Sequence, residues 1–253
     1  MKLARDTWLL FCRQFALVLR NPVWVIVGII QPLYYLFLFG PLLKKAYGDV
    51  SNSEAYRIFV PGVLVQLAIF GTFFVGFALI SELRAGVIER TRVTPVSRLA
   101  MLLGRSLRDV VTLLFQCLLI TVLSIPLGLT AVLGNILLAF ALLGLIGLML
   151  SAASYATALK LRSEDALAPL LNTIGIPILL LSGILIPISK QFAPSWLIHV
   201  AEWNPFYWAT SGARSLFAGQ AGDPNVWKAL VVLSGLTILS VWWAARSFAK
   251  SVR

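Results

Sequence analysis

The residues whose types could do chemistry are concentrated in one charged stretch, residues 82–109, which lies between long apolar runs. It holds six arginines and three acidic residues, whereas only 12% of the whole chain is charged. Positive charge in the loops of a membrane protein favours the cytoplasmic side. Such a loop can bind a soluble partner through ion pairs and charge-assisted hydrogen bonds. We interpret it as a docking element. From the pattern alone, a simply solvated positive loop is the alternative.

Patterns of catalytic chemistry are absent from the sequence. The single histidine, His199, excludes a two-histidine metal motif, and neither a phosphate-binding loop nor a Gly-x-Ser-x-Gly elbow occurs. The cysteines, Cys12 and Cys117, have no metal-binding spacing and are expected to be packing residues. We therefore expect no catalytic residue, no metal site and no cofactor in this chain.

The composition is that of a polytopic membrane protein. The chain has 253 residues, of which 59% are hydrophobic, and its mean hydropathy is +0.90. Soluble domains contain about 45–50% apolar residues. We interpret the net charge of +11 as the bias of cytoplasmic loops rather than as nucleic-acid binding. No ionisable residue is expected at mid-membrane depth, which argues against a proton-coupled transporter. The protein is then either a passive pore or driven by a partner.

An amphipathic helix is predicted at the N-terminus, within residues 1–22. A basic arc lies opposite an aromatic stripe, which is typical of a helix lying in the membrane interface. Packing on the protein's own spans is the alternative. The arc comprises Lys2, Arg5, Asp6, Arg13 and Arg20, and the stripe comprises Trp8, Phe11, Phe15 and Val18.

Six transmembrane helices are predicted to follow. The uncharged run 110–159 is too long for one span, and proline and glycine within residues 126–130 favour a turn that folds it back. With both termini inside, cytoplasmic segments hold 15 lysines and arginines and outer segments hold 6, so we expect cytoplasmic termini. The spans cover residues 23–43, 58–80, two helices within 110–159, 166–188 and 229–245.

The charged stretch is predicted to form two short helices. The first covers residues 82–92, Pro95 breaks the chain, and Ser97 caps the second helix. The second helix would present its charged face to the cytoplasm. That face comprises Arg98, Arg105, Arg108 and Asp109.

Three further features concern the later spans. Gly175 and Pro177 are expected to interrupt span five, which leaves room for a broken-helix site. Residues 190–228 combine prolines with aromatic side chains and predict short helices at the outer interface. Span four carries a stripe of small residues that predicts close packing inside the protein, with a dimer contact as the lesser alternative. The stripe comprises Gly144, Gly147, Ser151 and Ser154.

Two segments carry a family resemblance. Residues 81–98, with the sequence SELRAGVIERTRVTPVSR, and the following GRSLR at 104–108 resemble the signature of type-2 ABC transporter permeases, especially daunorubicin-resistance-like drug exporters. The segment SGILIP at 182–187 with the loop after it is also similar. The resemblance covers essentially the whole chain and specifies the family more strongly than the substrate.

The resemblance implies a single transmembrane domain over residues 1–253, without an ATPase site. A separate nucleotide-binding ATPase subunit would bind ATP and Mg, and a second permease copy would complete the exporter. The coupling region, within residues 82–109, would contact the ATPase. Its implied residues are Glu82, Arg84, Gly86, Glu89, Arg90, Arg92, Thr94 and Pro95. The outer loop, residues 189–228, would form re-entrant helices, with Pro187, Trp196, Asn204, Pro205, Arg214 and Gly219 as its implied residues.

These implications lead to an expected mechanism of alternating access in the bacterial inner membrane, moving a drug-like or lipid-like molecule outward. Candidate path residues are Gln66, Phe70, Phe73, Phe74, Phe77, Asn172 and Thr173. Aromatic walls with a few polar groups suit amphipathic cargo, although any single phenylalanine can be simple packing or lipid-facing surface. Export of a lipid or lipid-linked glycan is one alternative. A passive channel or a membrane scaffold is another, and a membrane enzyme is the least favoured.

Overall fold

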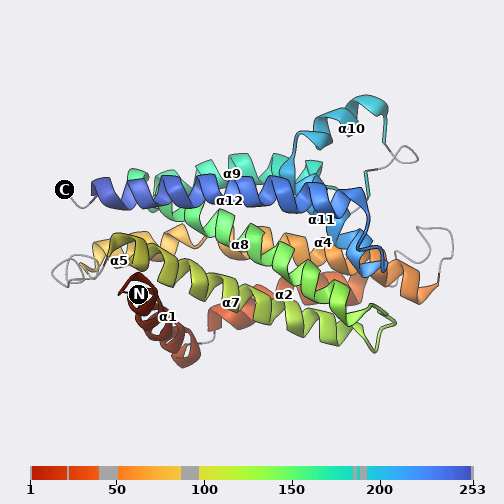
Figure 1. Ribbon diagram of the computed structural model, residues 1–253, viewed down its shortest axis with the longest axis horizontal. Helices are drawn as coiled ribbons and strands as arrows, with labels where there is room; N and C mark the ends of the chain where they lie inside the picture. Colours follow the sequence, from red (N-terminus) through yellow and green to blue (C-terminus); the bar gives the residue numbers. More distant parts are fainter. Residues whose placement is uncertain are drawn as a thin grey trace.

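The computed structural model describes residues 2–21, 23–39, 51–86, 97–184, 187–188 and 193–251, and every regular element in these ranges is helical. Long helices lie roughly along one direction, and both ends of the chain are found at the same end of the bundle (Figure 1). The elements are α1 (Lys2–Arg20), α2 (Val23–Tyr34), the π-helix η1 (Tyr35–Phe39), α4 (Asn52–Phe73), α5 (Gly76–Arg84), α7 (Arg98–Ser124), α8 (Leu133–Leu161), α9 (Glu164–Leu181), α10 (Ser195–Glu202), α11 (Pro205–Phe217) and α12 (Pro224–Ser251).

Within the described residues, five helical stretches are long and apolar enough to cross a membrane, namely 53–84, 98–124, 133–161, 164–181 and 224–249. A sixth exists only if α1 and α2, which are bent by 67°, are counted as one span. The expected first span begins as α2 and η1, and its residues 40–43 lie outside the described residues. The prediction of several membrane-spanning helices is therefore confirmed, with the first span covered only in part.

The predicted turn near residues 126–130 is confirmed. α7 ends at Ser124 and α8 begins at Leu133, and the two helices pack against each other along the bundle. Gly128 takes a φ of 115°, which a residue with a side chain rarely adopts. The predicted fold-back of the apolar run therefore depends on a glycine at the turn.

The second short helix of the charged stretch is not a separate element, and that expectation is wrong. Ser97 does cap a helix, because its side chain accepts from the N–H of Ala100, but this helix continues to Ser124 as a membrane-length span. Arg105 and Asp109 are only 6% and 7% exposed, so they do not face solvent as expected. The reason is that no proline follows Ser97 in α7, and the buried charges find partners inside the bundle.

Span five is not interrupted, which corrects a second expectation. α9 runs from Glu164 to Leu181 without a break at Gly175 or Pro177. Proline is tolerated in such helices when neighbouring groups satisfy the carbonyl that it leaves free. The helix stops at Leu181, directly before Ser182 and Gly183, and Gly183 takes a φ of 67°, which side chains disfavour.

α8 occupies the centre of the bundle and contacts α4, α5, α7, α11 and α12. Its small residues allow the close packing expected of them. A Cβ on Gly147 would lie 2.8 Å from a methyl group of Leu113 on α7. Ser154 donates to the carbonyl of Phe73 at 2.6 Å and accepts from the N–H of Gly76 at 2.9 Å. This side chain thus satisfies the backbone groups freed where α4 gives way to α5.

The prediction of short helices within residues 190–228 is confirmed by α10 and α11. They lie at the end of the bundle away from the chain termini (Figure 1). Asn204 caps α11 by accepting from the N–H of Phe206, and Pro205 occupies its first turn, where a missing N–H has no cost. Gly219, with a φ of 90°, ends the helix.

Candidate functional site

Basic residues gather at the end of the bundle that holds both ends of the chain, which we call the basic end. Here α5, α8 and α12 end, and α7 and α9 begin (Figure 1). The basic side chains at this end of the long helices are Arg84, Arg98, Arg105, Arg108, Lys160, Arg162 and Arg246. Two of them cover tryptophans of α12, since Lys160 lies over Trp243 at 5.0 Å and Arg246 over Trp242 at 3.8 Å.

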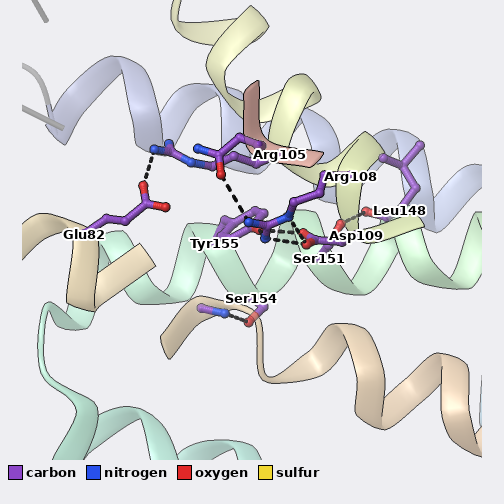
Figure 2. Close-up of polar contacts among 10 residues, drawn as sticks. Glu82, Arg105, Arg108, Asp109, Leu148, Ser151, Ser154 and Tyr155 are labelled. Atoms are coloured by element: carbon purple, nitrogen blue, oxygen red, sulfur yellow. Dashed lines mark hydrogen bonds and ion pairs between the residues drawn. The ribbon is translucent and has the colours of Figure 1, made fainter. Parts of the chain in front are cut away.

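A group of buried and partly buried polar side chains lies just inside the basic end. We call it the charge cluster, and it comprises Gln14, Glu82, Arg105, Arg108, Asp109 and Tyr155. Its members come from α1, α5, α7 and α8. Figure 2 shows five of them converging between these helices.

Asp109 is the centre of the charge cluster. One carboxylate oxygen accepts from Nε and Nη2 of Arg108, at 2.9 and 2.5 Å, and the other accepts from the hydroxyl of Tyr155 at 2.5 Å. Arg108 also donates to Oε1 of Gln14 at 3.2 Å. Both oxygens of the buried carboxylate are therefore hydrogen-bonded, and α1, α7 and α8 meet at this one group.

The second ion pair joins α5 to α7. Nη2 of Arg105 donates to Oε2 of Glu82 at 2.5 Å, and the two side chains are 7% and 24% exposed. With this pair, the charge cluster contains two arginines and two acidic residues, so its formal charge balances. Buried charges are tolerated when they are paired and hydrogen-bonded in this way.

The two helices that flank residues 87–96 are also tied to other parts of the bundle. At the end of α5, Arg84 pairs with Glu164 of α9 at 3.1 Å. At the start of α7, Arg98 donates to the carbonyl of Ala249 on α12 at 2.8 Å. If either flanking helix is displaced at the basic end, the displacement must therefore move α1, α8, α9 or α12 as well. Otherwise these contacts must break.

The expected coupling residues are only partly described. Glu82 belongs to the charge cluster, Arg84 pairs with α9, and Gly86 takes a φ of 68° directly after α5. The conformation of Gly86 explains why glycine stands there, because side chains disfavour it. Glu89, Arg90, Arg92, Thr94 and Pro95 lie outside the described residues, and the roles of all eight residues stay predictions.

The candidate path residues separate into those on α4 and α5, which are buried or partly buried, and those on α9, which are exposed. Phe70, Phe74 and Phe77 form a row along α4 and α5, with successive ring centroids 6.1 Å apart, and each is partly buried. Phe73 is buried, and a Cβ on Gly175 would lie 3.4 Å from its ring, so α4 and α9 are neighbours there. Gln66 is 6% exposed, and its carbonyl oxygen has no hydrogen-bond partner among the described residues.

The other two candidate path residues are on the surface. Asn172 and Thr173 are both exposed on α9. The most apolar part of α9 is only 17% buried, the lowest share among the membrane-length helices in the described ranges. The structure therefore brings the phenylalanines together but leaves these two polar residues on an open helix face.

Arg214 links three segments at the end of the bundle opposite the basic end. From α11, it donates to the carbonyl of Ile58 on α4 and to that of Ile184 after α9, both at 2.9 Å. A Cβ on Gly62 would lie 2.3 Å from the carbonyl oxygen of Ile184, so only glycine allows this approach. Asn204 adds a bond from Nδ2 to the carbonyl of Ile178 at 2.9 Å.

The remaining outer residues have different surroundings. Trp196 on α10 is 66% exposed, and Pro187 is half-buried. Asp223, directly before α12, accepts from the hydroxyl of Ser215 at 2.6 Å and from the N–H of Asn225 at 2.8 Å. These hydrogen bonds, that from Ser215 first, lower the pKa of the Asp223 carboxyl below its ordinary value.

Sequence reasoning missed Gln14 and Tyr155 as members of the charge cluster. The available signal was Asp109 itself, because a carboxylate that opens an uncharged run of membrane length needs buried partners. Among the described residues, no group of three or more histidine, cysteine or acidic side chains is arranged to hold a metal ion.

The sequence is similar to known transport proteins over most of its length. The sequence model of the ABC-2 type transporter family matches residues 5–218. The daunorubicin resistance ABC transporter permease DrrB1 of Streptomyces coeruleorubidus is 29% identical over 217 residues, which covers 85% of this chain and 76% of that protein. The transport permease ycf38 of Cyanophora paradoxa is 29% identical over 85% of this chain and 74% of its own. The ycf38 permease of Porphyra purpurea is 28% identical, covering 88% and 76%.

Proposed function

Because this chain belongs to the ABC-2 type transporter family, we propose that it is the permease subunit of an ATP-driven exporter of hydrophobic or amphipathic molecules. A permease is the membrane component of such a transporter, and a separate ATPase subunit would bind ATP and Mg. The drug-resistance permease among its relatives supports a drug-like or lipid-like cargo. We further propose two permease copies in the bacterial inner membrane, with both termini in the cytoplasm.

The observation that carries this proposal is the set of bonds around residues 87–96. The helix before this segment is bonded through Glu82 and Arg84, and the helix after it through Arg98 and Arg105. If the ATPase docks on this segment, its movement reaches both helices at once. The largely buried Glu82–Arg105 pair then favours movement as a unit over local bending, because separating it would leave the buried guanidinium of Arg105 without its partner.

Within this proposal, the coupling residues have different roles. Glu89, Arg90, Arg92 and Thr94 make the ATPase contacts, while Gly86 and Pro95 shape the bends at either end. Glu82 has an inward role, since it already bonds to Arg105 inside the bundle. Arg84 supports the same helix from the side of α9.

The proposed path runs along the row of phenylalanines. Phe70, Phe74 and Phe77 present an apolar, partly open wall on α4 and α5. The exposed Asn172 and Thr173 on α9 supply polar groups that become lining once a second copy covers this face. At the outer end, Arg214 holds α11 against α4 and the chain after α9, so its release would accompany opening of the exit.

The proposal is tested by separating ATPase docking from folding. The double variant Glu89→Ala, Arg90→Ala is compared with Glu202→Ala, Lys228→Ala, which removes the same charges at the opposite end. The permease is purified with its ATPase subunit, and ATP hydrolysis with and without candidate cargo is measured. We expect the first variant to be inserted normally but to lose cargo-stimulated hydrolysis, and the control to retain it.

Two results would contradict the proposal. Wild-type stimulation in the first variant would remove residues 89 and 90 from the coupling site. A permease that purifies without any ATP-binding subunit, and shows passive flux in vesicles, would favour the channel instead.

A further inference from the structure

A pocket of about 260 Å³ lies between α1, the end of α5 and the start of α7. It adjoins the charge cluster on the side of the N-terminal helix. The role proposed above for the charge cluster does not use this space. Its lining comprises Leu10, Arg13, Gln14, Leu17, Glu82, Met101 and Arg105.

Arg105 lines this pocket and has buried donors without partners among the described residues. The residue is 6% exposed, and its Nη2 is bonded to Glu82 (Figure 2). Its Nε and Nη1 are buried and have no hydrogen-bond partner among the described residues. A buried guanidinium with two unsatisfied nitrogens is costly unless a ligand supplies acceptor oxygens. The unpaired donors of this lining residue therefore favour an anionic or strongly accepting ligand over an apolar one.

The charge of the lining also favours an anion. Arg13 reaches the pocket from α1, where it is exposed and makes no ion pair with any described residue. The Glu82 carboxylate also lines the pocket and opposes an anion, but it already accepts from Arg105. Two arginines against one glutamate leave the lining with a positive balance.

Apart from Gln14, the rest of the lining is apolar. It comprises Leu10, Leu17 and Met101, and Leu17 is 52% exposed on α1. α1 also exposes Trp8 and Leu9, at 59% and 57%, so this helix presents apolar side chains to its surroundings beside the pocket. An arginine pair next to an apolar wall on an amphipathic helix matches a molecule with a phosphate at one end and hydrocarbon at the other.

We propose that this pocket binds the phosphate of an anionic phospholipid, with Arg105 and Arg13 as donors and Leu10, Leu17 and Met101 against its glycerol and upper acyl chain. The lipid would bridge α1, α5 and α7 at the basic end. This inference does not depend on the proposed export function or on the ATPase, because it requires only a membrane around the folded chain.

The test compares two arginines of the same helix. Arg13→Gln removes a pocket donor, whereas Arg5→Gln removes an exposed arginine of α1 that does not line the pocket. Delipidated full-length protein in detergent is titrated with dioleoylphosphatidylglycerol, and bound lipid is counted by native mass spectrometry. We expect Arg13→Gln to weaken binding about fivefold, as for one basic residue near an anionic headgroup. Arg5→Gln should bind as the wild type does.

A second variant examines the buried donor. Arg105→Gln should weaken binding about tenfold or more, because charge-assisted hydrogen bonds to phosphate are lost. Should this variant fail to fold, the comparison of Arg13 with Arg5 still decides the question. Equal binding by Arg13→Gln and Arg5→Gln would overturn the proposal.

Two further titrations identify the source of the phosphate. Inorganic phosphate and glycerol 3-phosphate are added in place of the lipid, and thermal stabilisation of the protein is recorded. Stabilisation by phosphatidylglycerol but by neither small anion supports the lipid. Equal stabilisation by inorganic phosphate would overturn the lipid assignment and leave a site for free phosphate. Equal binding of phosphatidylcholine and phosphatidylglycerol would overturn selection for an anionic headgroup.

Discussion

Asp109 determines the local chemistry of the charge cluster, because it is the one carboxylate that both Arg108 and Tyr155 bond directly. It is a buried charge whose partners come from its own helix and from α8. Removing one member of a buried ion pair is far more damaging than removing a neutral hydrogen-bond partner, since the remaining charge stays buried. The contacts of Asp109 with Arg108 and with Tyr155 can therefore be ranked by how much each contributes to the free energy of unfolding.

We expect Asp109→Asn to lower the free energy of unfolding by about 3–5 kcal/mol, because Arg108 loses its counter-charge. Tyr155→Phe should cost about 1.5–3 kcal/mol, the value of one hydrogen bond to a charged group. The two variants are compared by heating the detergent-solubilised proteins and measuring, by size-exclusion chromatography, how much of each has aggregated. An equal loss of stability in both variants would mean that the Tyr155 hydroxyl, not the ion pair with Arg108, is the main contribution of Asp109 to stability.

At the scale of elements, the docking of α1 on α7 depends on a glycine. A Cβ on Gly104 would lie 2.8 Å from Cβ of Leu10 and 3.2 Å from the backbone of Thr7 and Phe11. Backbone atoms cannot move aside as a flexible side chain can. This close approach brings Gln14 to Arg108 and forms one wall of the pocket described above.

Gly104→Ala is therefore expected to loosen α1 and to cost about 1–3 kcal/mol, the usual penalty of an extra buried methylene. Hydrogen exchange of the α1 amides should rise relative to those of α8. Gly134→Ala, in α8, is the matched control, because a Cβ there meets nothing within 4 Å. Unchanged exchange in α1 after the Gly104 substitution would show that the interface accommodates the extra methyl group without loosening α1.

For the whole molecule, the distribution of charge and the arrangement of helices agree. The basic end holds both ends of the chain, and α10 and α11 lie at the other end (Figure 1). Basic residues favour the cytoplasmic side, so this arrangement predicts cytoplasmic termini. The opposite end retains Arg57, Arg214 and Lys228, of which Arg57 bonds to Thr130 and Arg214 to backbone carbonyls.

Labelling with a membrane-impermeant thiol reagent tests this orientation. In a Cys12→Ser background, Lys2→Cys should react only after the cells are permeabilised, whereas Gln220→Cys should react in intact cells. Both positions are exposed, and the remaining Cys117 is buried. The reverse pattern would invert the topology and move the charged stretch to the outer side.

Features that depend on local pattern are predictable from the residues alone. Hydrophobic runs placed the long helices, and proline with glycine placed the turn between α7 and α8. The amphipathic period predicted α1, and Ser97 predicted the start of a helix. These are properties of neighbouring residues, so they can be read without knowing what the helices contact.

Which charges are buried, and with which partners, depends on how the helices pack. Glu82 and Arg105 are 23 positions apart, and Asp109 and Tyr155 are 46 apart, so no local pattern pairs them. These pairings allow the charged first turns of α7 to be buried in the bundle. The sequence alone favoured a separate, exposed helix for these residues. Burial of a charge depends on what the packed helices bring to it, because only a partner across the bundle compensates the lost hydration.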